Sequence, residues 1–211
     1  MDKSIQIGTF TRFAQVSRET ITSLKKYEEL LIKFNENLNL VGISTINSIW
    51  NRHFLDSAQV IDFIDKNDKS LLDIGSGAGF PGLVLAILAK DRKIPLKTKL
   101  LEKSPKKINF LKKVIKELDL NAEAINQNIL NTPVKLMEEV LVARAFKPLD
   151  IILKLIHKNA ENWKKIFIFL GKSGKNELFQ ASKSWDIKYK QRVSVTSSDS
   201  IVIEINELTK R

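Results

Sequence analysis

A glycine-rich stretch at residues 71–82, LLDIGSGAGFPG, is the pattern in this sequence best suited to bind a small molecule. An apolar run ends at Asp73, and glycines follow at Gly75, Gly77, Gly79 and Gly82. Glycines directly after a buried strand let the backbone turn sharply and let a ligand approach the main chain closely. The stretch therefore predicts a strand, a ligand-binding loop and a helix that begins near residue 82.

Two nucleotide cofactors compete for this loop. Residues 77–82 match the G-x-G-x-x-G pattern of NAD-binding proteins, which place a pyrophosphate against the helix N-terminus. The carboxylate of Asp73 would repel phosphates, whereas it suits S-adenosylmethionine, which carries a sulfonium and an ammonium. Glu102, at the end of the next predicted strand, can accept the ribose hydroxyls of either cofactor. The loop favours S-adenosylmethionine and leaves an NAD-linked oxidoreductase as an alternative.

The composition limits the chemistry further. The 211-residue chain has no Cys, which excludes thiolate zinc sites, Cys-ligated iron–sulfur clusters and a Cys nucleophile, and we expect no metal. A net charge of +11 favours a polyanionic partner, with nucleic acid preferred over an anionic membrane surface. No apolar run approaches the roughly 18–20 residues that span a bilayer, and the N-terminal residues lack a secretory h-region. We expect a cytoplasmic protein without a membrane anchor.

Hydrophobic periodicity divides the chain into a helical segment at 1–66 and a cofactor-binding domain at 67–211. Helical spacing predicts helices over 17–40, with Ser17 as N-cap, and over 47–64. Apolar runs then predict strands at 71–74, 96–101, 122–126, 140–143 and 166–170, with helices at 82–89, 104–118, 149–159 and 175–182. This alternation predicts a parallel sheet covered on both faces.

The last part of the chain has a different pattern. Two segments with alternating polarity, 184–195 and 200–208, are joined by TSSD and predict an antiparallel hairpin. A mostly parallel sheet that ends in such a hairpin is typical of the Rossmann-like class I methyltransferase fold. We therefore predict this α/β fold, preceded by a helical segment packed on its core.

Five motifs in this order resemble one family, the bacterial 16S ribosomal RNA guanine-N7 methyltransferases, also called glucose-inhibited division protein B. They are NLNLVGIS at 37–44, Arg52-His53-x-x-Asp56-Ser57, GFPG at 79–82, LLEKSPKKINFL at 100–111 and Arg144-Ala145-Phe146. The resemblance covers nearly the whole chain. It implies transfer of a methyl group from S-adenosylmethionine to N7 of a guanine in the 530 loop of 16S rRNA.

The resemblance also implies which residues contact the cofactor: Gly75, Phe80, Ile129, Leu130 and Arg144, with Glu102 at the ribose. One position departs from the family, which usually has Arg-x-Glu where this chain has Asn128-Ile129-Leu130. A contact through the backbone or through the Ile129 side chain survives this change. A contact that needs the carboxylate does not, so Leu130 is the least secure of these residues.

The sequence lacks the Asn/Asp-Pro-Pro-Tyr motif of enzymes that methylate exocyclic amines, and ARAFKP stands in its place. This leaves a ring nitrogen or a ribose oxygen as acceptor. Guanine N7 has an exposed lone pair and carries no proton, so its methylation requires alignment rather than a general base. The candidates for that alignment are Phe146, Arg144 and His53.

Each candidate has a structural alternative. Phe146 either stacks on the extruded guanine or belongs to the core, and Arg144 either holds a ligand or forms a surface salt bridge. For His53, beside Arg52, a structural role is favoured over a catalytic one.

An RNA-binding surface is predicted from cations near these motifs, namely Arg52, Lys106, Lys107, Lys112 and Lys113. The expected partner is 16S rRNA or the small ribosomal subunit, and the protein is expected to act as a monomer. A basic RNA-binding or ribosome-assembly protein without catalytic activity is a third possibility. The sequence LGKSGK at 170–175 resembles a phosphate-binding P-loop, but it lacks the required Gly at position 166, and we reject ATP binding there.

Overall fold

The computed structural model describes residues 2–131 and 134–211 of the chain. In chain order, its elements are α1 (Lys3–Ala14), α2 (Arg18–Leu38), η1 (Ile43–Ser48), η2 (Trp50–Leu55), α3 (Asp56–Ala58), η3 (Ile61–Phe63), β1 (Ser70–Ile74), α4 (Gly82–Asp91), β2 (Lys97–Glu102), α5 (Pro105–Glu117), β3 (Ala122–Asn126), β4 (Val140–Arg144), α6 (Leu149–Asn159), β5 (Lys165–Leu170), α7 (Gly174–Ala181), β6 (Trp185–Ser194) and β7 (Ser197–Lys210). The predicted strands are all present, with bounds that differ by a few residues at most of their ends.

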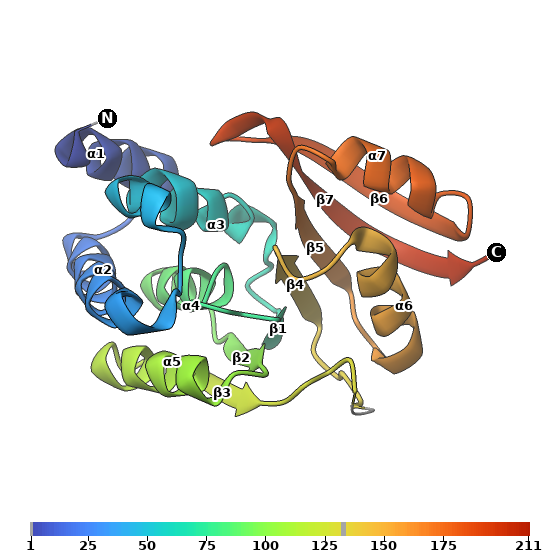
Figure 1. Cartoon of the computed structure of the whole chain (residues 1–211), viewed down its shortest axis with the longest axis horizontal. Helices are drawn as coiled ribbons and strands as arrows, with labels where there is room; N and C mark the ends of the chain where they lie inside the picture. Colours follow the sequence, from blue (N-terminus) through green and yellow to red (C-terminus); the bar gives the residue numbers. More distant parts are fainter. Residues whose placement is uncertain (1, 132–133) are drawn as a thin grey trace.

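The strands form one sheet in the order β3-β2-β1-β4-β5-β7-β6 (Figure 1). Strands β1 to β5 pair in parallel, whereas β7 is antiparallel to both β5 and β6. The C-terminal hairpin thus inserts its second strand beside β5. This topology confirms the predicted Rossmann-like class I methyltransferase fold. Because the strand order reverses beside β1, the carboxyl ends of β1, β2 and β4 border the crevice where such sheets bind ligands.

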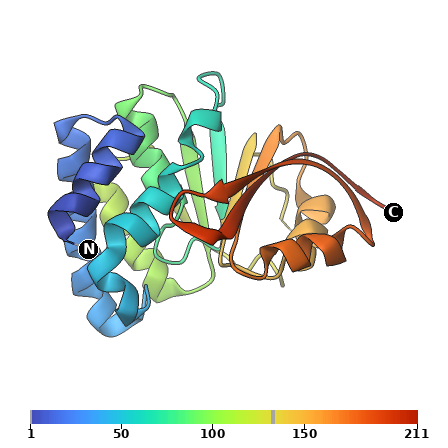
Figure 2. The same ribbon diagram turned by 90° about the horizontal axis from the view of Figure 1, so that it is seen from above.

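Helices cover both faces of the sheet (Figure 2). On one face, α4 and α5 pack with the N-terminal helices, and Phe10, Leu24 and Tyr27 share a core with Leu83 and Phe110. On the other face, α6 and α7 cover a second core that includes Leu72, Leu141 and Ile152. The N-terminal helices therefore bury their apolar sides against the half of the chain that forms the sheet. No helix among residues 2–131 and 134–211 is long and apolar enough to cross a membrane.

The N-terminal segment differs from the prediction in two places. Helix α1 was not expected; its sequence contains Gly8 and several polar residues, and it buries only Gln6, Phe10 and Ala14. The single helix predicted at 47–64 is instead a series of short turns: 3-10 helix at η1 and η3, a π-helix at η2 and one α-turn at α3. Ser, Thr and Asn in this region compete for backbone hydrogen bonds and disfavour a continuous α-helix. The Ser17 cap of α2 is confirmed, since its side chain accepts from Thr20 N.

Candidate active site

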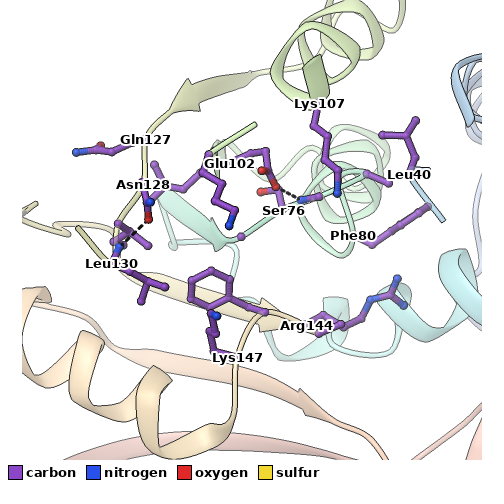
Figure 3. A pocket seen from close by; sticks show the side chains of 18 of the residues that line it. Leu40, Ser76, Phe80, Glu102, Lys107, Gln127, Asn128, Leu130, Arg144 and Lys147 are labelled. Atoms are coloured by element: carbon purple, nitrogen blue, oxygen red, sulfur yellow. Dashed lines mark hydrogen bonds between the residues drawn. The ribbon is translucent and has the colours of Figure 1, made fainter. Parts of the chain in front are cut away.

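A cavity of about 400 Å³ lies at the carboxyl ends of β1, β2 and β4 (Figure 3). It is lined by segments that are distant in the sequence, which are the glycine loop after β1, the starts of the loops after β2, β3 and β4, and parts of the helical segment. Most of the predicted cofactor residues line it, namely Gly75, Gly77, Phe80, Glu102, Ile129, Leu130 and Arg144. Two predicted residues, Asp73 and Gly79, do not line it.

The glycine loop adopts backbone conformations that favour glycine. Gly75, Gly77 and Gly79 have φ values of +76°, +58° and +94°. A Cβ on Gly75 would lie 2.1 Å from Cδ2 of Phe146, so the Phe146 ring covers this glycine closely. A Cβ on Gly79 would collide with Leu83 instead, which shows that Gly79 serves the packing of the loop on α4. Two close contacts therefore require glycine in the loop: Gly75 lies against Phe146 on the cavity side, and Gly79 lies against Leu83 of α4 on the other side.

Asp73 lies beneath the loop and is fully buried. Its Oδ2 accepts a hydrogen bond from Gly82 N at 3.0 Å, which fixes the start of α4, and Oδ1 has no partner within the described part of the chain. Burial raises the pKa of Asp73 to about 7. The carboxylate does not border the cavity, and its raised pKa weakens the repulsion of phosphates by which the sequence favoured S-adenosylmethionine over NAD. A direct contact between Asp73 and the cofactor stays a prediction.

Glu102 stands at the end of β2, where its carboxylate joins two loops. Oε2 accepts from Gly77 N at 3.0 Å and Oε1 accepts from Ser104 N at 2.8 Å. A carboxylate offers about four acceptor positions, so each oxygen retains capacity for a further donor. Because the side chain borders the cavity, it can accept the two ribose hydroxyls of an adenosine while it holds the glycine loop (Figure 3).

The loop after β3 supplies an apolar wall in place of the family's charged pair. Ile129 is buried and Leu130 is exposed, and Asn128 Oδ1 accepts from Leu130 N at 3.3 Å in a local turn. Both apolar side chains border the cavity beside Glu102. Such a surface suits the flat face of an adenine ring, and the turn presents it without a carboxylate. The residues present therefore fit S-adenosylmethionine: a glycine loop that borders the cavity, a ribose acceptor and an apolar wall.

Arg144, at the end of β4, is held on three sides. Its guanidinium donates to Asp56 Oδ2 at 2.8 Å and to the carbonyl of Arg52 at 3.2 Å, and Nη2 lies 2.9 Å from His53 Nδ1. The guanidinium carbon also lies 5.1 Å from the centre of the Phe80 ring. The partners of Arg144 fix its orientation at the cavity wall. It is part of a buried network rather than a surface salt bridge.

His53 is the third member of this network. It stacks on Phe80 with ring centres 4.9 Å apart, and its Nε2 lies 2.9 Å from Thr45 Oγ1. Because the arginine can only donate, Nδ1 accepts and the proton resides on Nε2. Burial, followed by the nearby charges of Arg144 and Arg52, lowers the pKa of His53 to about 3. A neutral, fully hydrogen-bonded imidazole supports the structural alternative.

Of the remaining predicted residues, Phe146 and Lys107 line the cofactor cavity, Lys107 pointing into it from α5 (Figure 3). Phe146 is half-buried and packs partly against the core, so a stacking role stays a prediction. Lys106, Lys112 and Lys113 are exposed on α5, and Lys113 pairs with Glu117 at 2.8 Å. Arg52 lines a neighbouring cavity instead. The structure thus places the four predicted lysines on α5 and the fifth predicted cation, Arg52, at a neighbouring cavity.

Sequence reasoning missed the central role of Asp56. Its Oδ1 accepts from Ser194 Oγ at 3.0 Å, at the end of β6, and from Thr196 Oγ1 at 3.1 Å, in the turn of the C-terminal hairpin. Asp56 belongs to a motif that carried the family resemblance, which was the available signal. The partners in the hairpin are 138 and 140 residues away and could not be assigned from spacing.

Comparisons with known proteins agree with this geometry. Residues 20–204 match the sequence profile of the GidB family, described as rRNA small subunit methyltransferase G. A protein of that name from Pelagibacter ubique is 39% identical over 198 residues, covering 93% of this chain and 92% of that protein. Another, from Rickettsia akari, is 37% identical over 196 residues, covering 93% and 98%.

Solved structures show the same fold at low sequence identity. A 16S rRNA methylase, RmtB, superimposes with a TM-score of 0.55 at 14% identity, over 91% of this chain and 76% of that one. A SAM-dependent methyltransferase from Aquifex aeolicus has a TM-score of 0.56 at 15% identity, over 82% and 96%. The family match selects S-adenosylmethionine over NAD as the cofactor. The chain belongs to the GidB family of S-adenosylmethionine-dependent small-subunit rRNA methyltransferases.

Proposed function

We propose that this protein methylates N7 of one guanine in the 530 loop of 16S rRNA. Membership of the GidB family supports the substrate class, and the resemblance of its motifs supports the position. We further propose that residues 1–66 and 67–211 act together as a monomer in the cytoplasm, on 16S rRNA or on the small subunit.

The observation that carries the proposal is that hydrogen bonds hold the polar groups facing the cofactor cavity in fixed orientations. His53 has a pKa of about 3 and is held between Arg144 and Thr45, while Glu102 is held by two backbone N–H groups. These groups are placed to orient ligands. N7 of guanine needs no deprotonation, so orientation is the contribution that its methylation requires.

When bound, S-adenosylmethionine supplies an electrophilic methyl group on a sulfonium. Glu102 and the wall at Ile129 and Leu130 would hold the adenosine, and the glycine loop would receive the methionine portion. Arg144 and Phe80, which pack against each other, would form the wall nearest the acceptor. Phe146, beside Gly75, is the aromatic surface available to an extruded base, and a methylated guanine is cationic, so an aromatic neighbour would stabilise it.

Mass-spectrometric mapping of 16S rRNA from cells with and without the gene tests the proposal. We expect one N7-methylguanine in the 530 loop that disappears when the gene is removed and returns with the purified protein and S-adenosylmethionine. Cleavage of the strand after borohydride and aniline treatment identifies N7 against other methylated positions. A methyl group at another atom or another loop would contradict the proposal, and an unchanged rRNA would favour the assembly-protein alternative.

A further inference from the structure

A second cavity, of about 340 Å³, lies beside the cofactor cavity, between the ends of β4 and β5, the helical segment and the turn of the β6–β7 hairpin. The two cavities share His53, Arg144 and Ala145 as a common wall. Its volume falls within the range of about 300–1000 Å³ that is usual for ligand sites. A molecule bound there would be separated from the methyl donor by a single layer of side chains.

The polar groups of this cavity fall into two sets. Asp56, Ser194 and Thr196 line it but are engaged with one another and with Arg144. Arg52, Ser197 and Ser200 also line it, and their side chains have no hydrogen-bond or ion-pair partner in the described ranges 2–131 and 134–211. The residues around this space therefore offer one cation and two hydroxyls that are not engaged elsewhere in the described ranges.

The charge around the opening favours an anion. Lys172 directly follows Gly171, which lines the cavity, and it is exposed without a carboxylate within 4 Å among the residues described. The carboxylate of Asp56 is neutralised by Arg144, and Asp199 lies exposed in the hairpin without lining the cavity. Guanidinium and hydroxyl groups together are the usual partners of phosphate and ribose oxygens in RNA.

We propose that the second cavity binds the phosphate and ribose of the RNA strand next to the reacting guanine. This inference rests on the proposed function and adds a subsite to it. Arg52 contacts the phosphate, while Ser197 and Ser200 contact the ribose or a second phosphate oxygen. The base then reaches past Ala145 toward the cofactor cavity, so the start of β7 takes part in binding the substrate.

The first test replaces the two free hydroxyls, as Ser197→Ala with Ser200→Ala. Two hydrogen bonds of ordinary strength correspond to about tenfold in affinity, so we expect binding to small-subunit rRNA to weaken by about that factor in a filter assay. Affinity for S-adenosylhomocysteine, measured by calorimetry, should stay unchanged and shows that the variant is folded. Ser198→Ala is the matched control, because Ser198 lies in the same strand, β7, is exposed and does not line the cavity.

The second test removes the charge. Arg52→Gln should lower the salt dependence of RNA binding by about 0.7 in the slope of log affinity against log salt, as expected for one phosphate contact on single-stranded RNA. The hydroxyl variant should weaken binding without changing the slope. Lys66→Gln, at the opposite, amino end of β1, is the charge control and should leave the slope unchanged.

RNA affinity and slope that are unchanged in both test variants would overturn the subsite. That result leaves the proposed function intact if the wild-type protein still methylates guanine N7. Conversely, weaker RNA binding in the variants, together with a wild-type protein that transfers no methyl group to rRNA, would retain the subsite and reject the proposed function. The two conclusions therefore fail under different results.

Discussion

Asp56 and Arg144 are 88 residues apart in the sequence and form an ion pair with 2.8 Å between Oδ2 and Nη1. Their side chains are only 16% and 14% exposed. The other oxygen of Asp56 accepts hydrogen bonds from the hairpin turn, through Ser194 and Thr196. This pair connects the helical segment, the end of β4 and the C-terminal hairpin in the wall between the two cavities.

Asp56→Ala should destabilise the protein and disorder this wall. Removing one partner of a largely buried pair leaves the Arg144 guanidinium without its counter-charge, and we expect a loss of about 2–4 kcal/mol in the free energy of unfolding. Urea denaturation measures the loss, and calorimetry should show weaker binding of S-adenosylhomocysteine because Arg144 borders that cavity.

The more exposed pair between Arg92 and Asp62 provides the control, with 28% and 61% of the side chains exposed. Asp62→Ala should cost no more than about 1 kcal/mol and should leave cofactor affinity unchanged. Equal losses of unfolding free energy in the two variants would contradict the prediction, because the ion pair of Arg144 would then contribute no more than an exposed pair.

His53→Gln should change how stability depends on pH. The folded pKa of about 3 is below the ordinary 6.5, so the fold favours the neutral ring, and its contribution is complete above pH 6.5 and decreases as pH falls. At pH 5 the wild type should have lost about 2 kcal/mol through this residue relative to pH 8. The variant lacks the titrating ring, so its stability deficit should shrink by that amount at pH 5.

Asp73 contributes with the opposite sign, since burial raises its pKa to about 7 and its effect on stability becomes unfavourable as pH rises from about 4 to 7. It is present in both proteins and cancels in the difference between them. Unfolding curves at pH 5 and pH 8 for both proteins complete the comparison. A deficit that is the same at both pH values would exclude a depressed pKa at His53.

The strands and the glycine loop were predictable from sequence because their signals are local. Buried parallel strands are short continuous apolar runs. The helix after β2 is predicted by Ser104 and Pro105, which occupy its N-cap and its first position. Residues such as Gly75 and Glu102 were located by their place at strand ends, and parallel strands bring these ends together at one edge.

The structural features that the sequence did not predict depend on packing between residues that are far apart in the chain. The burial of Asp73 beneath Gly82 follows from how α4 docks on β1, which spacing along the chain does not encode. The wall built by Asp56 requires the hairpin turn to fold back onto the helical segment. Helix α1 was not predicted because only a few of its residues are buried, against the segment at η2. Its sequence therefore shows only a weak apolar face.

Gly82→Ala tests the close approach of α4 to the sheet. A Cβ at this position would lie 2.5 Å from Leu100 Cδ2 and 2.7 Å from Asp73 Oδ2. Overpacking of this kind costs about 1–3 kcal/mol, measured by urea denaturation. Gly8→Ala is the matched control, because nothing lies within 4 Å of its Cβ and the site is helical, so it should stabilise the protein by about 0.4–1 kcal/mol. Destabilisation by Gly8→Ala, or none by Gly82→Ala, would be inconsistent with these packing distances.

The predicted RNA surface on α5 requires a changed experiment. Lys107 borders the cofactor cavity, so a charge reversal there affects both ligands, whereas Lys106 and Lys112 are exposed and have no carboxylate within 4 Å in the described part of the chain. Lys106→Glu with Lys112→Glu should weaken binding to small-subunit rRNA and lower its salt dependence, since two phosphate contacts are lost. Affinity for S-adenosylhomocysteine should remain as in the wild type. Unchanged RNA affinity at moderate salt would remove α5 from the RNA surface.

Glu102→Gln tests whether the carboxylate at the end of β2 holds the ribose of the cofactor. The amide oxygen can still accept one backbone hydrogen bond, but the charge is lost, and hydrogen bonds to charged groups contribute about 1.5–3 kcal/mol. We therefore expect S-adenosylhomocysteine to bind about 10- to 100-fold more weakly by calorimetry. An analogue that lacks both ribose hydroxyls should bind the two proteins equally, because it offers nothing to the carboxylate. Glu117→Gln, on the exposed face of α5, should bind both ligands as the wild type does. If Glu102→Gln weakens both ligands by the same factor, the residue acts by holding Gly77 and Ser104 and not through the ribose.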